Sequence, residues 1–107
     1  MTLRQEKVRE NIKHLAAEFL QRESTGNSLI TVTDANISKD LKKATIFITV
    51  LPEAGEDSAL NFAKRKRSAI RNFIKTKLQM RMLPYLDFEI DQGEKNRQKI
   101  DELSLKL

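Results

Sequence analysis

The apolar residues of this 107-residue chain change their spacing several times along its length, and the order of these spacings is the strongest constraint on the fold. Over 3–23 they recur every three or four residues, which predicts an amphipathic helix. Two runs rich in β-branched residues, 29–33 and 44–51, predict an antiparallel pair of strands. A second helical pattern covers 58–82, and strict alternation over 85–91 predicts a third strand. This order predicts an α+β domain with a three-stranded sheet and both helices on one face.

The same patterns predict the core and the extent of the domain. Residues 1–91 should form one domain, and the polar segment 92–107 should be a tail that is either a short helix or disordered. The side chains expected to point inward are Val8, Ile12, Leu15, Ala16, Phe19, Leu20, Ala44, Ile46, Ile48, Val50, Leu60, Ala63, Ile70, Phe73, Ile74, Leu78, Leu86, Phe88 and Ile90.

The residue inventory argues against catalysis and metal binding. The chain has no cysteine and a single histidine, His14, so neither a catalytic triad nor a Cys/His zinc site can be assembled. Three glycines do not form a phosphate-binding loop. Asp87, Glu89 and Asp91 alternate with apolar residues, which favours an exposed sheet face over a metal site. We therefore expect no enzymatic activity, no cofactor, no metal and no small-molecule substrate.

The charge and hydropathy of the chain predict where it is found and what kind of partner it has. No apolar run approaches the ~20 residues that span a bilayer, and the mixed-charge start 1–7 does not resemble a signal peptide. We expect a cytoplasmic protein without a membrane partner. The net charge of +5 favours a polyanionic partner.

The positive charge is concentrated in the second predicted helix. No acidic residue occurs from position 58 to position 86, so the helix lacks the Glu–Lys pairs that normally support an exposed helical face. Lys64, Arg71 and Lys75 lie along one flank at helical spacing. Phosphate groups would supply the missing counter-charge, and this pattern predicts contact with a nucleic-acid backbone rather than a merely solvated surface.

Arg67 conflicts with a continuous second helix. Helical geometry places it between Ala63 and Ile70, on the face that must be buried. Burying an unpaired cation costs several kcal/mol. A break near 66–68 that turns Arg67 outward would avoid this cost, and the alternative is that Arg67 reaches past the edge of the core.

Several motifs, in this order and spacing, resemble the ribosome-binding factor A family. The Ser-x-Asp-Leu turn before a strand and the Arg-x-x-Pro-x-Leu exit from the second helix are the most specific. The matching segments are Lys7-Val8, Leu20-Gln21-Arg22-Glu23, Val32-Thr33-Asp34, Ile37-Ser38-Lys39-Asp40-Leu41, Ala44-Thr45-Ile46-Phe47-Ile48-Thr49-Val50, Ala59-Leu60-Asn61, Arg81-Met82-Leu83-Pro84-Tyr85-Leu86 and Ile100-Asp101-Glu102-Leu103.

The resemblance implies a type II KH-like fold, in the order α-β-β-α(kinked)-β, and a function in ribosome assembly. Proteins of this family bind the small ribosomal subunit and its rRNA near the decoding-region helix during late maturation and processing, and their loss affects growth in the cold most. In place of the Gly-x-x-Gly loop of KH domains they carry an Ala-x-Gly helix kink. That kink aligns with Lys66-Arg67-Ser68, where neither the Ala nor the Gly is kept.

The resemblance and the charge pattern together define the expected RNA-binding residues of a monomeric protein. The first group is Lys64, Arg65, Lys66, Arg67, Arg71 and Lys75, and the second is Arg4, Lys7, Lys39, Lys42 and Lys43. Two alternatives remain open at this point. One is a KH-like module for other RNAs, and the other is a protein-interaction or dimerisation module that uses the strand face carrying Phe47 and Leu51.

Overall fold

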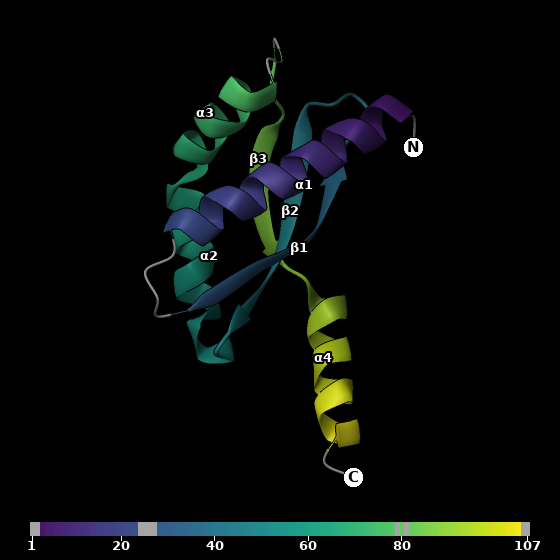
Figure 1. Cartoon of the computed structure of the whole chain (residues 1–107), viewed down its shortest axis with the longest axis vertical. Helices are drawn as coiled ribbons and strands as arrows, with labels where there is room; N and C mark the ends of the chain where they lie inside the picture. Colours follow the sequence, from purple (N-terminus) through teal and green to yellow (C-terminus); the bar gives the residue numbers. More distant parts are fainter. Residues whose placement is uncertain (1–2, 24–27, 79, 81, 106–107) are drawn as a thin grey trace.

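The computed structural model describes residues 3–23, 28–78, 80 and 82–105. Within these residues, four α-helices, one short 3-10 helix and three strands occur in the order shown in Figure 1. Their bounds are α1 Leu3–Glu23, β1 Leu29–Ile37, β2 Lys43–Leu51, η1 Glu53–Gly55, α2 Glu56–Arg65, α3 Arg67–Leu78, β3 Tyr85–Ile90 and α4 Gln92–Leu105.

The three strands form one mixed sheet in the order β1-β2-β3. β1 and β2 are antiparallel, as predicted, with Leu29 opposite Leu51 and Ile37 opposite Ala44. β2 and β3 are parallel, with Lys43 opposite Tyr85. Parallel neighbours need a long crossover connection, which α2 and α3 supply.

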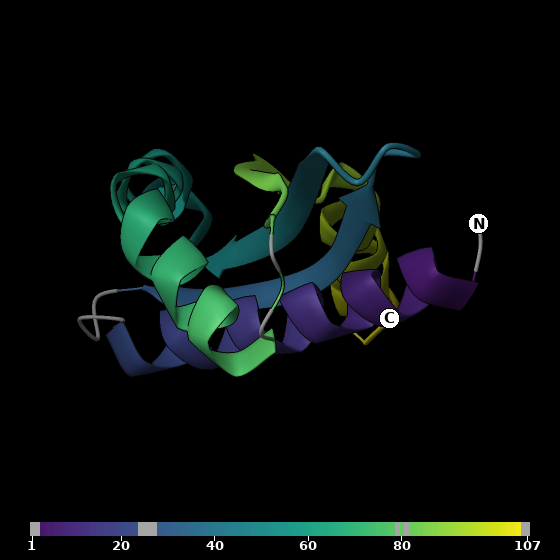
Figure 2. The ribbon, with the colours of Figure 1, turned by 90° about the horizontal axis from the view of Figure 1, so that it is seen from above.

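The core lies between the sheet and helices α1, α2 and α3. Figure 2 shows α1 and α3 beneath one face of the sheet, and the predicted α+β architecture is confirmed. Ile12, Ile46 and Ile74 are completely buried, and each such side chain stabilises the fold by about 1.5–3 kcal/mol. The core cluster consists of Val8, Ile12, Ala16, Phe19, Leu20, Ile37, Ala44, Ile46, Ile48, Val50, Ala59, Ala63, Ile70, Ile74, Leu83, Leu86 and Phe88.

The Ser-x-Asp-Leu segment forms the tight turn between β1 and β2. The Ser38 hydroxyl donates to Asp40 Oδ1 (2.7 Å) and accepts the backbone N–H of Lys43 (3.0 Å). This hydroxyl and the backbone N–H of Lys42 hold the pKa of Asp40 below its ordinary value. Leu41 has a left-handed φ of 61°, a conformation that usually favours glycine. Its side chain packs against the core, which explains why a leucine occupies this position.

The segment after β3 is a helix, α4, which extends away from the rest of the molecule in Figure 1. Asp91 caps it, because Oδ1 accepts the backbone N–H of Glu94 (3.0 Å) while Oδ2 accepts the Thr33 hydroxyl (2.6 Å). Lys95 Nζ lies 2.6 Å from a carboxylate oxygen of Glu53, and the carboxylates of Glu53 and Glu56 raise the pKa of Lys95. Polar contacts in its first turn therefore fasten α4 to β1 and η1.

The structure corrects three predicted boundaries. β1 continues to Ile37 instead of ending at position 33, because a register shift between Val32 and Asp34 lets the strand pass polar residues and bury Ala35 and Ile37. The second helix begins at Glu56, ends at Leu78 and is interrupted once.

Within the described part of the chain, no helix has the length and apolar character needed to cross a membrane.

Candidate nucleic-acid interface

The second helical segment is interrupted at one residue, Lys66. α2 ends at Arg65 and α3 begins at Arg67, so the interruption lies inside the segment 66–68 where a break was predicted. The backbone N–H of Lys66 still donates to the Phe62 carbonyl (3.0 Å), and its carbonyl accepts the N–H of Ile70 (2.9 Å). The two helices are therefore joined by a single non-helical residue that keeps its backbone hydrogen bonds.

A stripe of unpaired cations follows α2 and α3. We define the basic stripe as Lys64, Arg65, Arg71 and Lys75, all of which are exposed. None of these side chains has an ion-pair or hydrogen-bond partner among the residues that the structure describes. Lys64 and Arg65 also line a shallow hollow of about 610 Å³ together with Ser58 and Asn61. The stripe can therefore offer its full charge and its N–H donors to an external anion.

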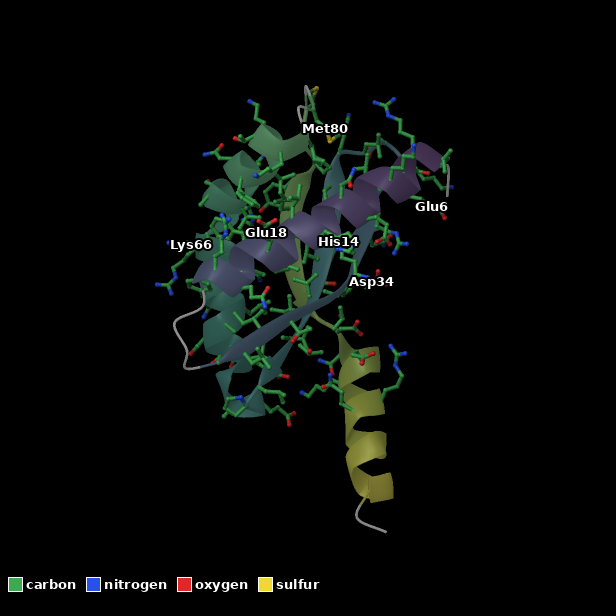
Figure 3. All side chains as sticks on the ribbon, viewed as in Figure 1. Glu6, His14, Glu18, Asp34, Lys66 and Met80 are labelled. Atoms are coloured by element: carbon green, nitrogen blue, oxygen red, sulfur yellow. The ribbon has the colours of Figure 1, made fainter. Side chains whose placement is uncertain are left out.

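Arg9 and Arg22 on α1 differ, because each is paired with an acidic side chain of α1 or β1. Arg9 binds Asp34 (2.9 Å) as well as Glu10 (3.1 Å), and Arg22 lies 3.6 Å from Glu18. Figure 3 shows His14 and Glu18 on α1, and Lys66 beside the junction of α2 and α3. Arg9 and Arg22 therefore differ from the cations of the basic stripe, which have no acidic partner among the described residues.

Two residues of the first predicted group contact the protein itself. Lys66 Nζ lies 6.0 Å from the centre of the Phe62 ring. The Arg67 guanidinium lies 4.6 Å from the centre of the Tyr85 ring and 3.4 Å from Asp87 Oδ1. Arg67 does not turn freely into solvent, but reaches β3 at the edge of the sheet, which is the alternative that the sequence left open.

The second predicted group lies at the end of the molecule toward which α3 runs. Arg4 and Lys7 are exposed in the first turns of α1, Lys39 and Lys42 are exposed in the β1–β2 turn, and Lys43 is exposed at the start of β2. Gln5 Nε2 donates to the Lys39 carbonyl (3.4 Å) and joins these two segments. A groove of about 390 Å³, lined by Arg4, Lys7, Leu78 and Met80 among others, separates them from the end of α3. Arg4 and Lys7 thus lie across this groove from the end of α3.

The partners of Arg67 could not be predicted from the sequence. Glu89 is exposed on β3 as predicted, whereas Asp87 and Asp91 are half-buried and engaged by Arg67 and Thr33. The sequence feature that could have indicated these partners is the alternation over 85–91, which places Tyr85 and Asp87 on the same face of the strand. Across the described residues, no three His, Cys, Asp or Glu side chains are arranged to hold a metal ion.

Comparison with known sequences gives a consistent family match. The family model described as ribosome-binding factor A matches residues 4–104. Ribosome-binding factor A from Methylorubrum extorquens is 33% identical over 109 residues, which cover 95% of this chain and 74% of that protein. The protein of the same name from Macrococcus caseolyticus is 27% identical over 110 residues, covering 100% of this chain and 96% of that protein.

Solved structures agree with this match. The crystal structure of ribosome-binding factor A from Thermus thermophilus has a TM-score of 0.73 and 24% identity, over 80% of this chain and 93% of that chain. A homology model of the Thermus thermophilus factor was fitted into a cryo-electron microscopy map of its complex with the 30S subunit. It has a TM-score of 0.69 and 25% identity, over 78% of this chain and 91% of that chain.

Proposed function

Because the chain belongs to the ribosome-binding factor A family, we propose that it binds the small ribosomal subunit through rRNA during late maturation and processing. The proposed activity is binding without a chemical step. The basic stripe of α2 and α3 contacts the phosphate backbone, and the second cation group around the start of α1 extends the contact.

The unpaired state of the basic stripe is the observation that carries this proposal. Like charges along one helical flank repel one another and destabilise the free protein. No described acidic side chain relieves this repulsion at Lys64, Arg65, Arg71 or Lys75. An RNA backbone supplies negative charge at the density that such a stripe requires, and binding releases its counterions.

The aromatic side chains indicate the mode of recognition. Arg67 lies over the ring of Tyr85, and Phe47 is half-buried in the sheet. Arg67 therefore occupies one face of the Tyr85 ring, and Phe47 offers only part of its surface to a base. Contacts to phosphates and to the shape of a folded RNA should therefore dominate over reading of base identity.

The sheet face proposed as a protein interface offers limited support for that alternative. Leu29 and Leu51 are exposed and lie opposite each other in the β1–β2 pair. Together with the exposed Tyr85 and the half-buried Phe47, they are few beside the roughly 20–30 residues that each partner contributes to a standard interface. The described surface therefore favours RNA as the main partner.

Binding to separated ribosomal subunits over a salt series tests the proposal. We expect co-sedimentation with the small subunit and much weaker association with the large subunit. If the stripe neutralises phosphates, affinity should fall by roughly 100-fold between 50 and 200 mM salt, as for about four phosphate contacts. Equal binding to both subunits, or binding that is insensitive to salt, would contradict the proposal. Tight binding to short single-stranded RNA would instead indicate a general RNA-binding module.

A further inference from the structure

Arg67 is the first residue of α3, and its side chain is held against β3. The guanidinium carbon lies 4.6 Å from the centre of the Tyr85 ring, and one terminal nitrogen lies 3.4 Å from Asp87 Oδ1. The side chain is only 28% exposed. Its Nε atom is buried and has no hydrogen-bond partner among the described residues. Arg67 therefore differs from its neighbours in the sequence, Arg65 and Arg71, which are exposed and unpaired.

The acceptor for Arg67 is itself fixed by the strand. Asp87 Oδ1 also accepts the backbone N–H of Phe88 (2.9 Å), and the Phe88 side chain is buried in the core. β3 is an edge strand of the sheet, and Arg67 contacts two of its side chains, Tyr85 and Asp87. The contact thus connects the start of α3 to a rigid part of the fold.

The sequence around the break contains no residue that would set the angle between α2 and α3. Neither glycine nor proline occurs at positions 65–68, although these are the usual causes of a helix kink. The backbone hydrogen bonds of Lys66 continue across the junction. The contacts of Arg67 with Tyr85 and Asp87 add a polar restraint at this point to the core packing of the buried Ala63 and Ile70.

We infer that Arg67 is a positioning residue that fixes the start of α3 against β3, and so holds the cations of α2 and α3 in one arrangement for RNA. In this role, the Arg67 side chain does not itself contact phosphate. The part of this inference that concerns RNA rests on the proposed function, whereas the part that concerns the geometry of the two helices does not.

The geometry can be measured without RNA, because the chain has no native cysteine. Spin labels at Asn61→Cys in α2 and Asn72→Cys in α3, both exposed positions, report the distance between the helices. We expect one narrow distance distribution in the parent protein and a broader one after Arg67→Met, Asp87→Asn or Tyr85→Leu. Arg67→Lys should not restore the narrow distribution, because lysine lacks the planar guanidinium. Arg71→Met is the matched control and should leave the distribution unchanged.

Binding to the small subunit distinguishes a positioning residue from a phosphate ligand. At temperatures where every variant is folded, Arg67→Met and Asp87→Asn should both weaken binding by about threefold to tenfold with little change in the salt dependence. Arg71→Met should weaken binding and lower the salt slope by about one.

Two results would overturn the inference. One is a lower salt slope for Arg67→Met together with an unchanged distance distribution, which would make Arg67 a phosphate ligand. The other is unchanged or tighter binding by Asp87→Asn, which would mean that the Asp87 contact only withholds Arg67 from RNA. If the parent protein bound no subunit, the proposed function would fail, and the distance distributions alone would still decide the role of Arg67.

Discussion

The double charge reversal Arg71→Glu/Lys75→Glu should weaken binding to the small subunit by about 100-fold or more at low salt. Both side chains are exposed on α3 and have no partner in the described structure, so the change removes two phosphate contacts and adds repulsion. The protein should remain folded, because neither residue belongs to the core. Affinity measured by sedimentation or filter binding, with a thermal melt of each variant, checks this result.

An arginine outside the stripe provides the matched control. Arg97 is exposed on α4, where it pairs with Glu94, and Arg97→Glu changes the net charge by the same amount as Arg71→Glu. We expect Arg71→Glu to weaken binding severalfold more than Arg97→Glu. Similar losses for the two single variants would show that only the total charge matters, and would remove the basic stripe as the binding site.

Replacing Asp91 should detach α4 and destabilise the protein. Asp91→Ala removes the cap of α4 and leaves the Thr33 hydroxyl without its carboxylate partner. The expected loss is about 2 kcal/mol of unfolding free energy at neutral pH. Hydrogen exchange in α4 should accelerate as well. Glu89→Ala, at an exposed position on the adjoining strand, is the control and should change stability far less.

The stabilisation that Asp91 provides should depend on pH in a defined direction. The Thr33 hydroxyl, the backbone N–H of Glu94 and the charge of Arg97 lower the pKa of Asp91 in the folded protein. Its charged form therefore contributes stability above the unfolded pKa of about 3.9, and that contribution is lost as the pH falls through the lower folded pKa. The stability difference between the parent protein and Asp91→Asn should shrink below about pH 4. A difference that persisted unchanged into strong acid would contradict the assigned contacts.

Local patterns were sufficient to predict most of the fold. The helical period over 3–23 and the alternation over 44–51 depend on near neighbours in the sequence, and both elements are confirmed. The break at Lys66 follows from one physical conflict, because an unbroken helix would bury the cation at Arg67. By contrast, β1 was predicted too short, because Asp34 and Asn36 are residue types that are depleted in strands, and the bulge that carries the strand past Asp34 depends on pairing with β2.

The parts of the site that could not be predicted depend on contacts between residues far apart in the sequence. Arg67 and Asp87 are separated by 20 positions, and Lys95 and Glu56 by 39. Sequence spacing does not report such contacts, because they form only after the parallel β2–β3 pairing brings the strands and helices together. For the same reason, sequence alone grouped Arg67 with the stripe, whereas its contacts separate it from Arg65 and Arg71.

Site-specific crosslinking to rRNA tests the proposed RNA interface most directly. Ser68 is exposed at the start of α3, and Ser68→Cys introduces a single thiol for a photoreactive label because the chain has no native cysteine. Glu18→Cys, at an exposed position on α1, is the control. Strong crosslinks from position 68 to small-subunit rRNA, and few from position 18, are the expected result. Crosslinks of equal strength from both positions, or none from position 68 in a complex that has formed, would contradict an RNA interface on α2 and α3.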